Sequence, residues 1–284
     1  MDMIWKVVLV CVLLFLCMML IGVIDGNRFV VKKEKFVLPK LEKSCRFVMI
    51  SDLHNKVYGK NNEKVVKAVK KANPDFIVIV GDLITSHAHE AMDPGINLVN
   101  ALSKDYKIYY SMGNHETKIK IYPEKYGDMY DRLMKEIEHP NVKILADENI
   151  VLPEYNICIT GLELERAYFA RFTKKELEQG DLEKHIGNVK KQYCNILLAH
   201  NPDYFANYAT WGADFVLSGH VHGGIMRLPI LGGVIAPSYK LFPKYDGGIF
   251  REGNATMLLG HGMGSHTLPF RFFNPACLYV VDIK

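Results

Sequence analysis

Short apolar runs alternate with polar, lysine-rich stretches along the part of the chain that begins near residue 45. Two of these runs, Cys45–Ile50 and Phe76–Val80, are each followed by a turn signal, which is typical of strands buried on both faces of a sheet. Between them, apolar residues recur at helical spacing over residues 61–73, and Pro74 ends the pattern. The pattern therefore predicts a β-α-β unit whose strands are parallel and joined by a right-handed crossover.

The same signals predict the elements of the rest of the chain. Helices are expected over residues 94–104, 126–138 and 173–192, and strands over 107–112, 142–145, 149–152, 155–160, 194–199, 214–217, 256–259 and 278–283. The three strands between residues 142 and 160 have hairpin-like spacing. Residues 25–44 are charged and are expected to form an extended tether. No linker divides the rest of the chain, which we expect to form one domain.

Residues 4–24 form an apolar segment that is interrupted only by Lys6 and Gly22. Its length suffices for a helix that crosses a bilayer. A cleaved secretory signal is the alternative, but no Ala-x-Ala site follows the apolar core. We therefore expect a single-pass anchor in the cell membrane over residues 1–27 and a folded domain over residues 28–284. The basic residues after the segment favour a cytoplasmic domain, whereas the very short preceding tail favours the opposite side, so both orientations stay open.

Net charge and cysteine spacing provide no sign of nucleic-acid binding or of a cysteine metal site. The net charge of the 284 residues is +4, which is too small to predict binding to nucleic acid. Two of the six cysteines lie in the apolar segment, and the other four lie in or beside predicted strands without C-x-x-C spacing. We interpret these four as small buried hydrophobic residues.

Five predicted strands end in a carboxylate, an imidazole or a carboxamide. The residues concerned are Asp52, His54, Asp82, Asn114, His115, His200, His220 and His222. A turn aspartate, a capping asparagine or a core histidine would explain any one of them. Five such strand ends at the same end of one sheet instead indicate a shared site, because open α/β sheets bind their ligands there.

The types of these side chains predict a metal site. The set contains no thiolate, which excludes a structural zinc site of the cysteine type. Imidazole together with carboxylate suits manganese, iron, zinc or cobalt. The residues are too many for one ion, whereas two ions roughly 3.5–4 Å apart would use them all, and such pairs catalyse phosphoryl transfer to water.

The motifs at these strand ends resemble those of a known family. Asp52-Leu53-His54, Gly81-Asp82, Gly113-Asn114-His115-Glu116, His200 and Gly219-His220-Val221-His222 resemble, in this order, the motifs of the calcineurin-like metallophosphoesterases. The apolar N-terminus and the segment 262–272 are similar to those of the membrane-anchored bacterial branch with the YkuE and YaeI types. The stretch Asn55-Lys56 departs from the pattern, where the family often has an apolar residue and a glycine.

The resemblance implies a fold and a set of ligands. The fold would be a four-layer αββα sandwich, in which helices flank two mixed β-sheets, with the N-terminal transmembrane helix added. Asp52, His54 and His222 would bind the first divalent ion, and Asn114, His200 and His220 would bind the second. Asp82 would bridge both ions, which would be Mn²⁺, Fe²⁺ or Zn²⁺, and His115 would stand beside the scissile phosphate without binding metal.

These expectations combine into a membrane-anchored, dinuclear-metal-dependent phosphoesterase. It would hydrolyse phosphodiester or pyrophosphate bonds, lipid-linked substrates among them, by attack of a metal-bound hydroxide. His115 would supply the proton that the leaving alkoxide needs. A catalytically silent scaffold that keeps the fold for protein binding is the alternative. Such a chain is expected to lose ligands, and none is missing here.

Three further features each leave two interpretations open. Arg271 could hold a phosphate oxygen bidentately or be a surface arginine. The apolar residues 225–242 could lie against lipid and accept an acyl chain, or pack on the edge of the sheet. His261 and His266 could line the site, or be surface or capping residues like the remaining histidines, His87, His89, His139 and His185.

Overall fold

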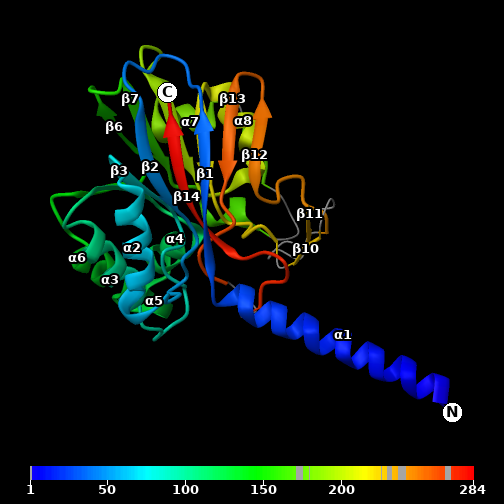
Figure 1. Ribbon diagram of the computed structural model, residues 1–284. Helices are drawn as coiled ribbons and strands as arrows, with labels where there is room; N and C mark the ends of the chain where they lie inside the picture. The colour runs from blue at the N-terminus through cyan, green and yellow to red at the C-terminus, as the bar shows by residue number, and fades with distance from the viewer. Residues whose placement is uncertain are drawn as a thin grey trace.

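The structure is a computed structural model that describes residues 2–170, 175–178, 180–224, 226–228, 232–235, 241–265 and 270–284. Helix α1 (Asp2–Gly26) leaves the folded part as a single exposed helix (Figure 1). Among the described residues it is the one helix that is long and apolar enough to cross a membrane. The remainder is built around two six-stranded mixed sheets and one small two-stranded sheet.

The two large sheets account for most of the strands. The first sheet has the order β1 (Phe29–Phe36), β14 (Ala276–Ile283), β2 (Cys45–Ile50), β3 (Phe76–Val80), β4 (Lys107–Ser111) and β5 (Val142–Leu145). The second has the order β12 (Gly248–Glu252), β13 (Ala255–Leu259), β9 (Phe215–Ser218), β8 (Cys194–Ala199), β7 (Ile157–Leu162) and β6 (Glu148–Leu152). The small sheet pairs β10 (Met226–Leu228) with β11 (Gly232–Ile235).

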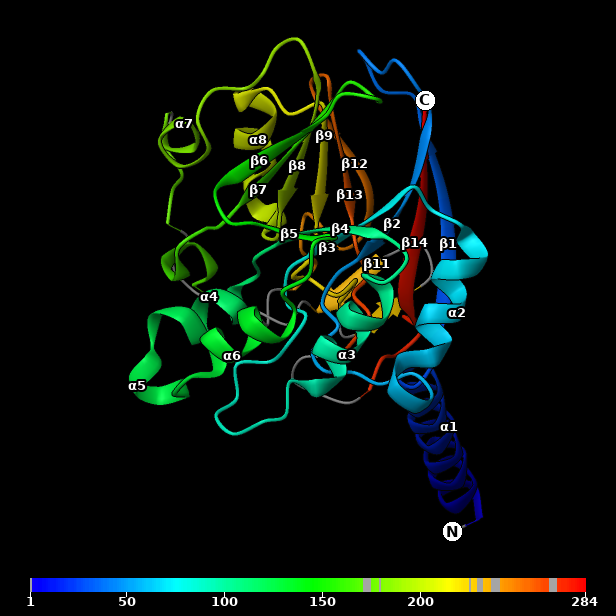
Figure 2. The same cartoon turned by 90° about the vertical axis from the view of Figure 1, so that its left-hand side faces the viewer.

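Helices cover the outer faces of both large sheets (Figures 1 and 2). The first sheet is covered by α2 (Glu63–Ala72), α3 (Asp93–Leu102), α4 (Asn114–Ile121), α5 (Pro123–Tyr126) and α6 (Met129–Glu136). The second is covered by α7 (Asp181–Ile186) and α8 (Phe205–Trp211). Short 3-10 turns lie at Lys60–Asn62, Arg166–Phe169 and Pro202–Tyr204. The four-layer arrangement expected from the family resemblance is thereby confirmed.

The central strand β3 shows why the layers hold together. Ile77 and Ile79 point into the apolar cluster shared with the helices. Phe76, Val78 and Val80 point into the cluster between the two sheets. All five side chains are buried, so the continuous apolar run is required by burial on both faces, as the sequence predicted.

Three of the local predictions are wrong. The segment expected to be a tether contributes β1, eight residues that pair in parallel with β14 at the edge of the first sheet. The strand over residues 142–145 forms no hairpin with the next one, because β5 pairs with β4 in the first sheet while β6 pairs with β7 in the second. The chain changes sheets at Asp147, whose φ of 54° turns the backbone. In the polar region 173–192 the described helix is only α7, and residues 173, 174 and 179 lie outside the described residues.

Candidate metal centre

The predicted site residues come from strands of two different sheets. β2, β3 and β4 are parallel neighbours in the first sheet, and β8 and β9 are parallel neighbours in the second. The expectation that all five strands share one sheet is therefore wrong. The residues meet because the two sheets are stacked with these carboxyl ends at a common edge, which we call the ligand edge. Asp52 from the first sheet thus lies beside His222 from the second.

Three overlapping groups of ligand atoms form at this edge. The first contains Asp52, His54 and His222, the second contains His54, Asp82 and His115, and the third contains Asp82, His200 and His220. Within each group the ligand atoms lie within 4.8 Å of one another. The second residue group links the other two, because His54 and Asp82 each belong to two groups.

Individual distances show how closely the carboxylates and imidazoles approach. The Nε2 atom of His200 lies 3.1 Å from Oδ2 of Asp82, and the Nε2 atom of His54 lies 3.7 Å from the same oxygen. The Nε2 atoms of His54 and His222 are 3.0 Å apart. Two ring nitrogens this close, both facing carboxylates, form the kind of donor set that a divalent cation occupies.

Buried oxygens supply a test of whether this set fits a metal. Oδ2 of Asp52 and Oδ1 of Asn114 are both buried, and neither accepts a hydrogen bond from any described residue. A buried polar atom without a partner is costly unless an ion or water satisfies it. The donor set of carboxylate, carboxamide and imidazole therefore fits divalent metal ions, as the chemistry of the sequence motifs indicates.

The backbone at these residues is unusual. Asp52, His54, Asp82, His220 and His222 have φ values of 51°, 47°, 52°, 72° and 56°. Such left-handed conformations are unfavourable for side chains other than glycine and collect at functional sites. The ligand atoms of Asp52 and His54 consequently come into one group through left-handed backbone at both residues, and not through the alternation of extended backbone that the sequence predicted.

Two glycines allow the loops after β3 and β4 to approach each other. A Cβ atom on Gly81 would lie 2.5 Å from the Cα atom of Gly113, and one on Gly113 would lie 2.3 Å from Oδ1 of Asp82. The backbone N–H of His115 donates to that same oxygen at 2.9 Å. The glycines thus permit a contact that fixes one oxygen of Asp82 and leaves the other directed toward the histidines.

Charge and burial act in opposite directions on the ionisable groups. Burial raises the pKa of Asp52 to about 6, although the charge of His200 works against that rise. Burial also acts to raise the pKa of Asp82, but the neighbouring His200, His115 and His54 lower it further, so that it lies well below its usual range. Burial acts to lower the pKa of His200, yet the charge and hydrogen bond of Asp82 raise it to about 10. The site therefore holds Asp82 as a carboxylate facing positive charge.

Glu116 supports the site, although it was not among the site residues that the sequence predicts. Its fully buried carboxylate accepts hydrogen bonds from the backbone N–H groups of Asp82 at 2.8 Å, Leu83 at 2.8 Å and Gly113 at 2.9 Å. These donors belong to the loops after β3 and β4, so Glu116 ties the two loops together. The available signal was its position as the last residue of the Gly113-Asn114-His115-Glu116 block, near the N-terminus of α4.

The hydrogen bonding of His115 defines its protonation. The backbone N–H of Ser86 donates to Nδ1 of His115 at 2.7 Å. Because Nδ1 accepts this bond, the neutral ring carries its proton on Nε2. The Nε2 atom lies 4.0 Å from Oδ2 of Asp82, at the ligand edge. His115 thus presents an N–H donor to the site.

Arg271 is a buried residue and not a surface residue. Only 3% of the residue is exposed, and its guanidinium donates to the backbone carbonyls of Asn274 at 2.7 Å, Gly264 at 2.6 Å, His222 at 3.0 Å and also His261. The interpretation as a surface arginine is therefore wrong, and the guanidinium that the other interpretation assigned to phosphate is engaged by backbone carbonyls. The arginine helps to fix the loop of His222, because buried carbonyls need donors and the guanidinium supplies them together with the Asn274 amide, which donates to the carbonyl of His222 at 2.8 Å.

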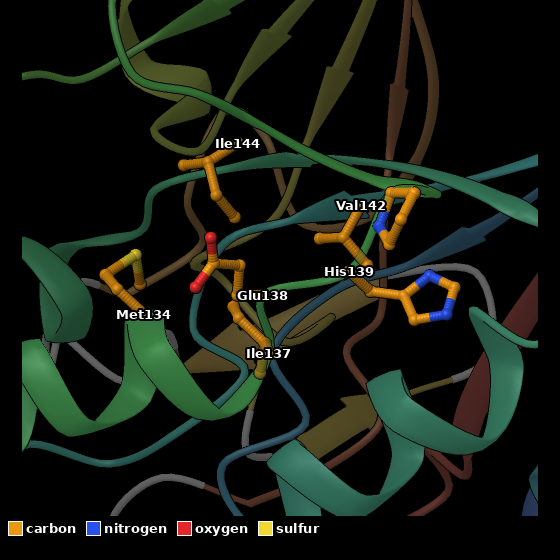
Figure 3. A pocket seen from close by; sticks show the side chains of 7 residues that line it. Met134, Ile137, Glu138, His139, Val142 and Ile144 are labelled. Atoms are coloured by element: carbon orange, nitrogen blue, oxygen red, sulfur yellow. The ribbon is translucent and has the colours of Figure 1, made fainter.

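The remaining histidines lie outside the three groups. His87 pairs with Glu90 and His185 with Asp147, as expected of surface residues. His261 is buried and bonds through Nδ1 to the hydroxyl of Tyr279 at 2.5 Å, while His266 lies outside the described residues. His139 lines a hollow of about 480 Å³ together with Glu138, Ile137 and other residues (Figure 3). That hollow lies at the start of β5, which is the end of the first sheet opposite the ligand edge.

Comparisons with known proteins point to one family. Residues 45–224 match the family Calcineurin-like phosphoesterase. An uncharacterized metallophosphoesterase of Campylobacter jejuni is 30% identical over 262 residues, covering 89% of this chain and 63% of that protein. The metallophosphoesterase YkuE of Bacillus subtilis is 26% identical over 245 residues, covering 84% of this chain and 79% of that protein. The UDP-2,3-diacylglucosamine pyrophosphatase LpxG of Chlamydia muridarum is 24% identical over 287 residues, covering 82% and 84%. The chain thus spans less than two thirds of the length of the Campylobacter relative.

Proposed function

Because the chain belongs to the calcineurin-like phosphoesterase family, we propose that it is a membrane-anchored enzyme that hydrolyses phosphodiester or pyrophosphate bonds with two divalent ions. Membership of the family makes it a metal-dependent phosphoester hydrolase. The number of ions, the substrate and the single-pass anchor are the parts that we propose. The observation that carries the proposal is the overlap of the three ligand groups at the ligand edge, where His54 joins the first group to the second and Asp82 joins the second to the third.

The proposed ligands divide between the two ions. Asp52, His54 and His222 would hold one ion, and Asn114, His200 and His220 would hold the other. Asp82 would be shared, which agrees with its place in two of the three groups. When bound, Mn²⁺, Fe²⁺ or Zn²⁺ ions would neutralise phosphoryl oxygens and lower the pKa of water to ~7.

His115 is the proposed catalytic residue. Its Nε2–H faces the site while Ser86 holds the other ring nitrogen, so the ring cannot turn without losing a buried hydrogen bond. An N–H in this position would donate to the oxygen of the leaving group as negative charge develops on it.

Lipid-linked phosphoesters are the substrates that we favour. α1 would keep the domain at a membrane, and the similar Chlamydia protein is named for a diacylated sugar nucleotide. A phosphate group at the surface of the bilayer would be available to an anchored site.

The full-length chain in detergent, loaded with Mn²⁺, provides the test. We expect hydrolysis of a soluble aryl phosphodiester, two bound ions per chain by elemental analysis, and faster turnover of a lipid-linked pyrophosphate. His115→Ala should lower turnover by roughly 10²–10⁴-fold and leave the two ions bound. The matched control is His139→Ala, which changes a histidine far from the ligand edge.

Two results would contradict the proposal. A chain that binds no ions and hydrolyses no phosphoester would be a silent scaffold of this fold. A His115→Ala variant that loses an ion would show that His115 is a ligand.

A further inference from the structure

The helix α1 leaves the domain at the ligand edge. β1 begins at Phe29, soon after α1 ends at Gly26, and Phe29 is paired with Ala276 at the start of β14. β14 runs antiparallel to β2, so the start of β14 lies where β2 ends, next to Asp52. Figures 1 and 2 show α1 departing from this end of the sheets. A bilayer that α1 spans would therefore lie on the same side of the domain as the metal centre.

The base of α1 is packed against the domain. The backbone N–H of Arg271 donates to the carbonyl of Gly22 at 3.2 Å. The ring of Phe272 lies so close to Gly22 that a Cβ atom there would be 2.6 Å from Cε1 of the ring. The side chain of Lys56 donates to Oδ1 of Asn27 at 2.9 Å. These contacts limit how far the domain can tilt relative to the helix.

Two exposed apolar side chains, Leu241 and Phe242, are connected to the base of α1 through the small sheet of β10 and β11. Phe272 forms a bridge with Met226 of β10, which pairs with β11. Leu241 forms a bridge with Ile235 of β11, and the N–H of Phe242 donates to Val234 at 2.9 Å. Leu241 and Phe242 are nevertheless 64% and 60% exposed.

A third apolar side chain stands beside the helix itself. Phe273 is 44% exposed and, with Ile21, Ile24 and Arg28, lines a hollow of about 430 Å³ at the base of α1. Together with Leu241 and Phe242 it forms what we call the apolar rim. Exposed Lys244 follows the rim, and a basic residue beside aromatic and aliphatic ones is typical of helices and loops that lie in a membrane interface.

We propose that the apolar rim is a second membrane contact, which enters the boundary between headgroups and acyl chains of the bilayer that α1 spans. Its partner is the lipid bilayer. With α1 it makes two points of attachment, which direct the ligand edge toward the membrane surface. Phosphate groups of membrane lipids would then meet the metal centre without leaving the bilayer. The inference rests on the proposed membrane anchor.

Depth-dependent fluorescence quenching tests the rim in the full-length chain. Both test variants are made in a Trp5→Phe background. Phe242→Trp places an indole on the rim. Val37→Trp is the matched control, because Val37 is 77% exposed and lies just beyond the end of β1 that is far from the ligand edge. Val37 lies about 26 Å from the start of β1 at the ligand edge, from eight residues at ~3.3 Å each. The emission of buried Trp211 is present in every variant, and it is measured in the Trp5→Phe variant alone and subtracted.

The proteins are reconstituted into vesicles with and without brominated phosphatidylcholine. The added emission of Phe242→Trp should fall roughly twofold with brominated lipid, because side chains in the interface lie about 5–10 Å deep. The emission of Val37→Trp should not change. Equal quenching of the two variants would overturn the rim as a membrane contact.

Two further measurements distinguish a failure of the rim from a failure of the proposed anchor or of the proposed phosphoesterase activity. Trp5 of the unaltered chain reports on α1, and its failure to be quenched would overturn both the anchor and the rim. Quenching of Trp5 without quenching of Phe242→Trp overturns the rim alone. Hydrolysis of a soluble aryl phosphodiester by Phe242→Trp confirms that the variant is folded and tests the proposed chemistry independently of the membrane.

Discussion

Replacing Glu116 with glutamine should weaken both the fold and the metal centre, because one buried carboxylate joins the two loops that carry Asp82 and Asn114. The carboxylate accepts three short hydrogen bonds from backbone N–H groups, at 2.8, 2.8 and 2.9 Å. Glutamine has a single acceptor oxygen, and its amide N–H₂ would face at least one backbone donor. One oxygen of Glu116 serves Leu83, and the other serves both Asp82 and Gly113.

The magnitude follows from the number of bonds lost. A hydrogen bond to a charged group contributes about 1.5–3 kcal/mol, so losing one or two of them costs about 2–5 kcal/mol. Burial and the nearby Asp82 raise the pKa of Glu116, which shows that its negative charge is disfavoured there. Removing that charge offsets part of the loss, so we expect the free energy of unfolding to fall by about 2–4 kcal/mol.

Chemical and thermal denaturation of the chain in detergent, followed by the fluorescence of buried Trp211 in a Trp5→Phe background, measure this loss. The melting temperature should fall by roughly 5–10 °C, and titration with Mn²⁺ should show weaker binding of both ions, since Asp82 is the proposed shared ligand. Glu136→Gln is the control, because Glu136 pairs with Arg132 on an exposed helix face and should change stability by less than about 0.5 kcal/mol. Unchanged denaturation and unchanged metal binding in Glu116→Gln would refute the reasoning.

Two other changes test how the site is held. Asp82→Asn should weaken the binding of both ions in a Mn²⁺ titration, whereas His222→Asn, which belongs to one group only, should weaken one; equal effects would contradict a bridging Asp82. Arg271→Met would remove a charged donor from four buried carbonyls, of which that of His222 keeps a second donor in the Asn274 amide, and should lower the free energy of unfolding by at least about 3 kcal/mol. Arg251→Met on exposed β12 is the control, and a similar loss there would argue against a special role for Arg271.

Much of the fold and of the candidate site is determined by local sequence. The period of apolar residues is a local property, so it identified β2, β3 and α2 and required that β3 be buried on both faces. The order of polar residues at the strand ends is also local. It identifies the residues of all three ligand groups without any knowledge of which strands are neighbours in space. The length of the apolar N-terminus likewise predicted α1.

The partners of these elements are decided only by the tertiary structure. Strand pairing joins residues far apart in the chain, so no local pattern could show that the ligands come from two sheets or that residues 29–36 pair with β14. The left-handed backbone at Asp52 and Asp82 opposes local preference and is held by contacts such as those of Glu116. Arg271 resembles a phosphate ligand in sequence, yet burial beside four carbonyls gives it a structural role. Local chemistry thus supplied the ligands, and packing between distant segments placed them.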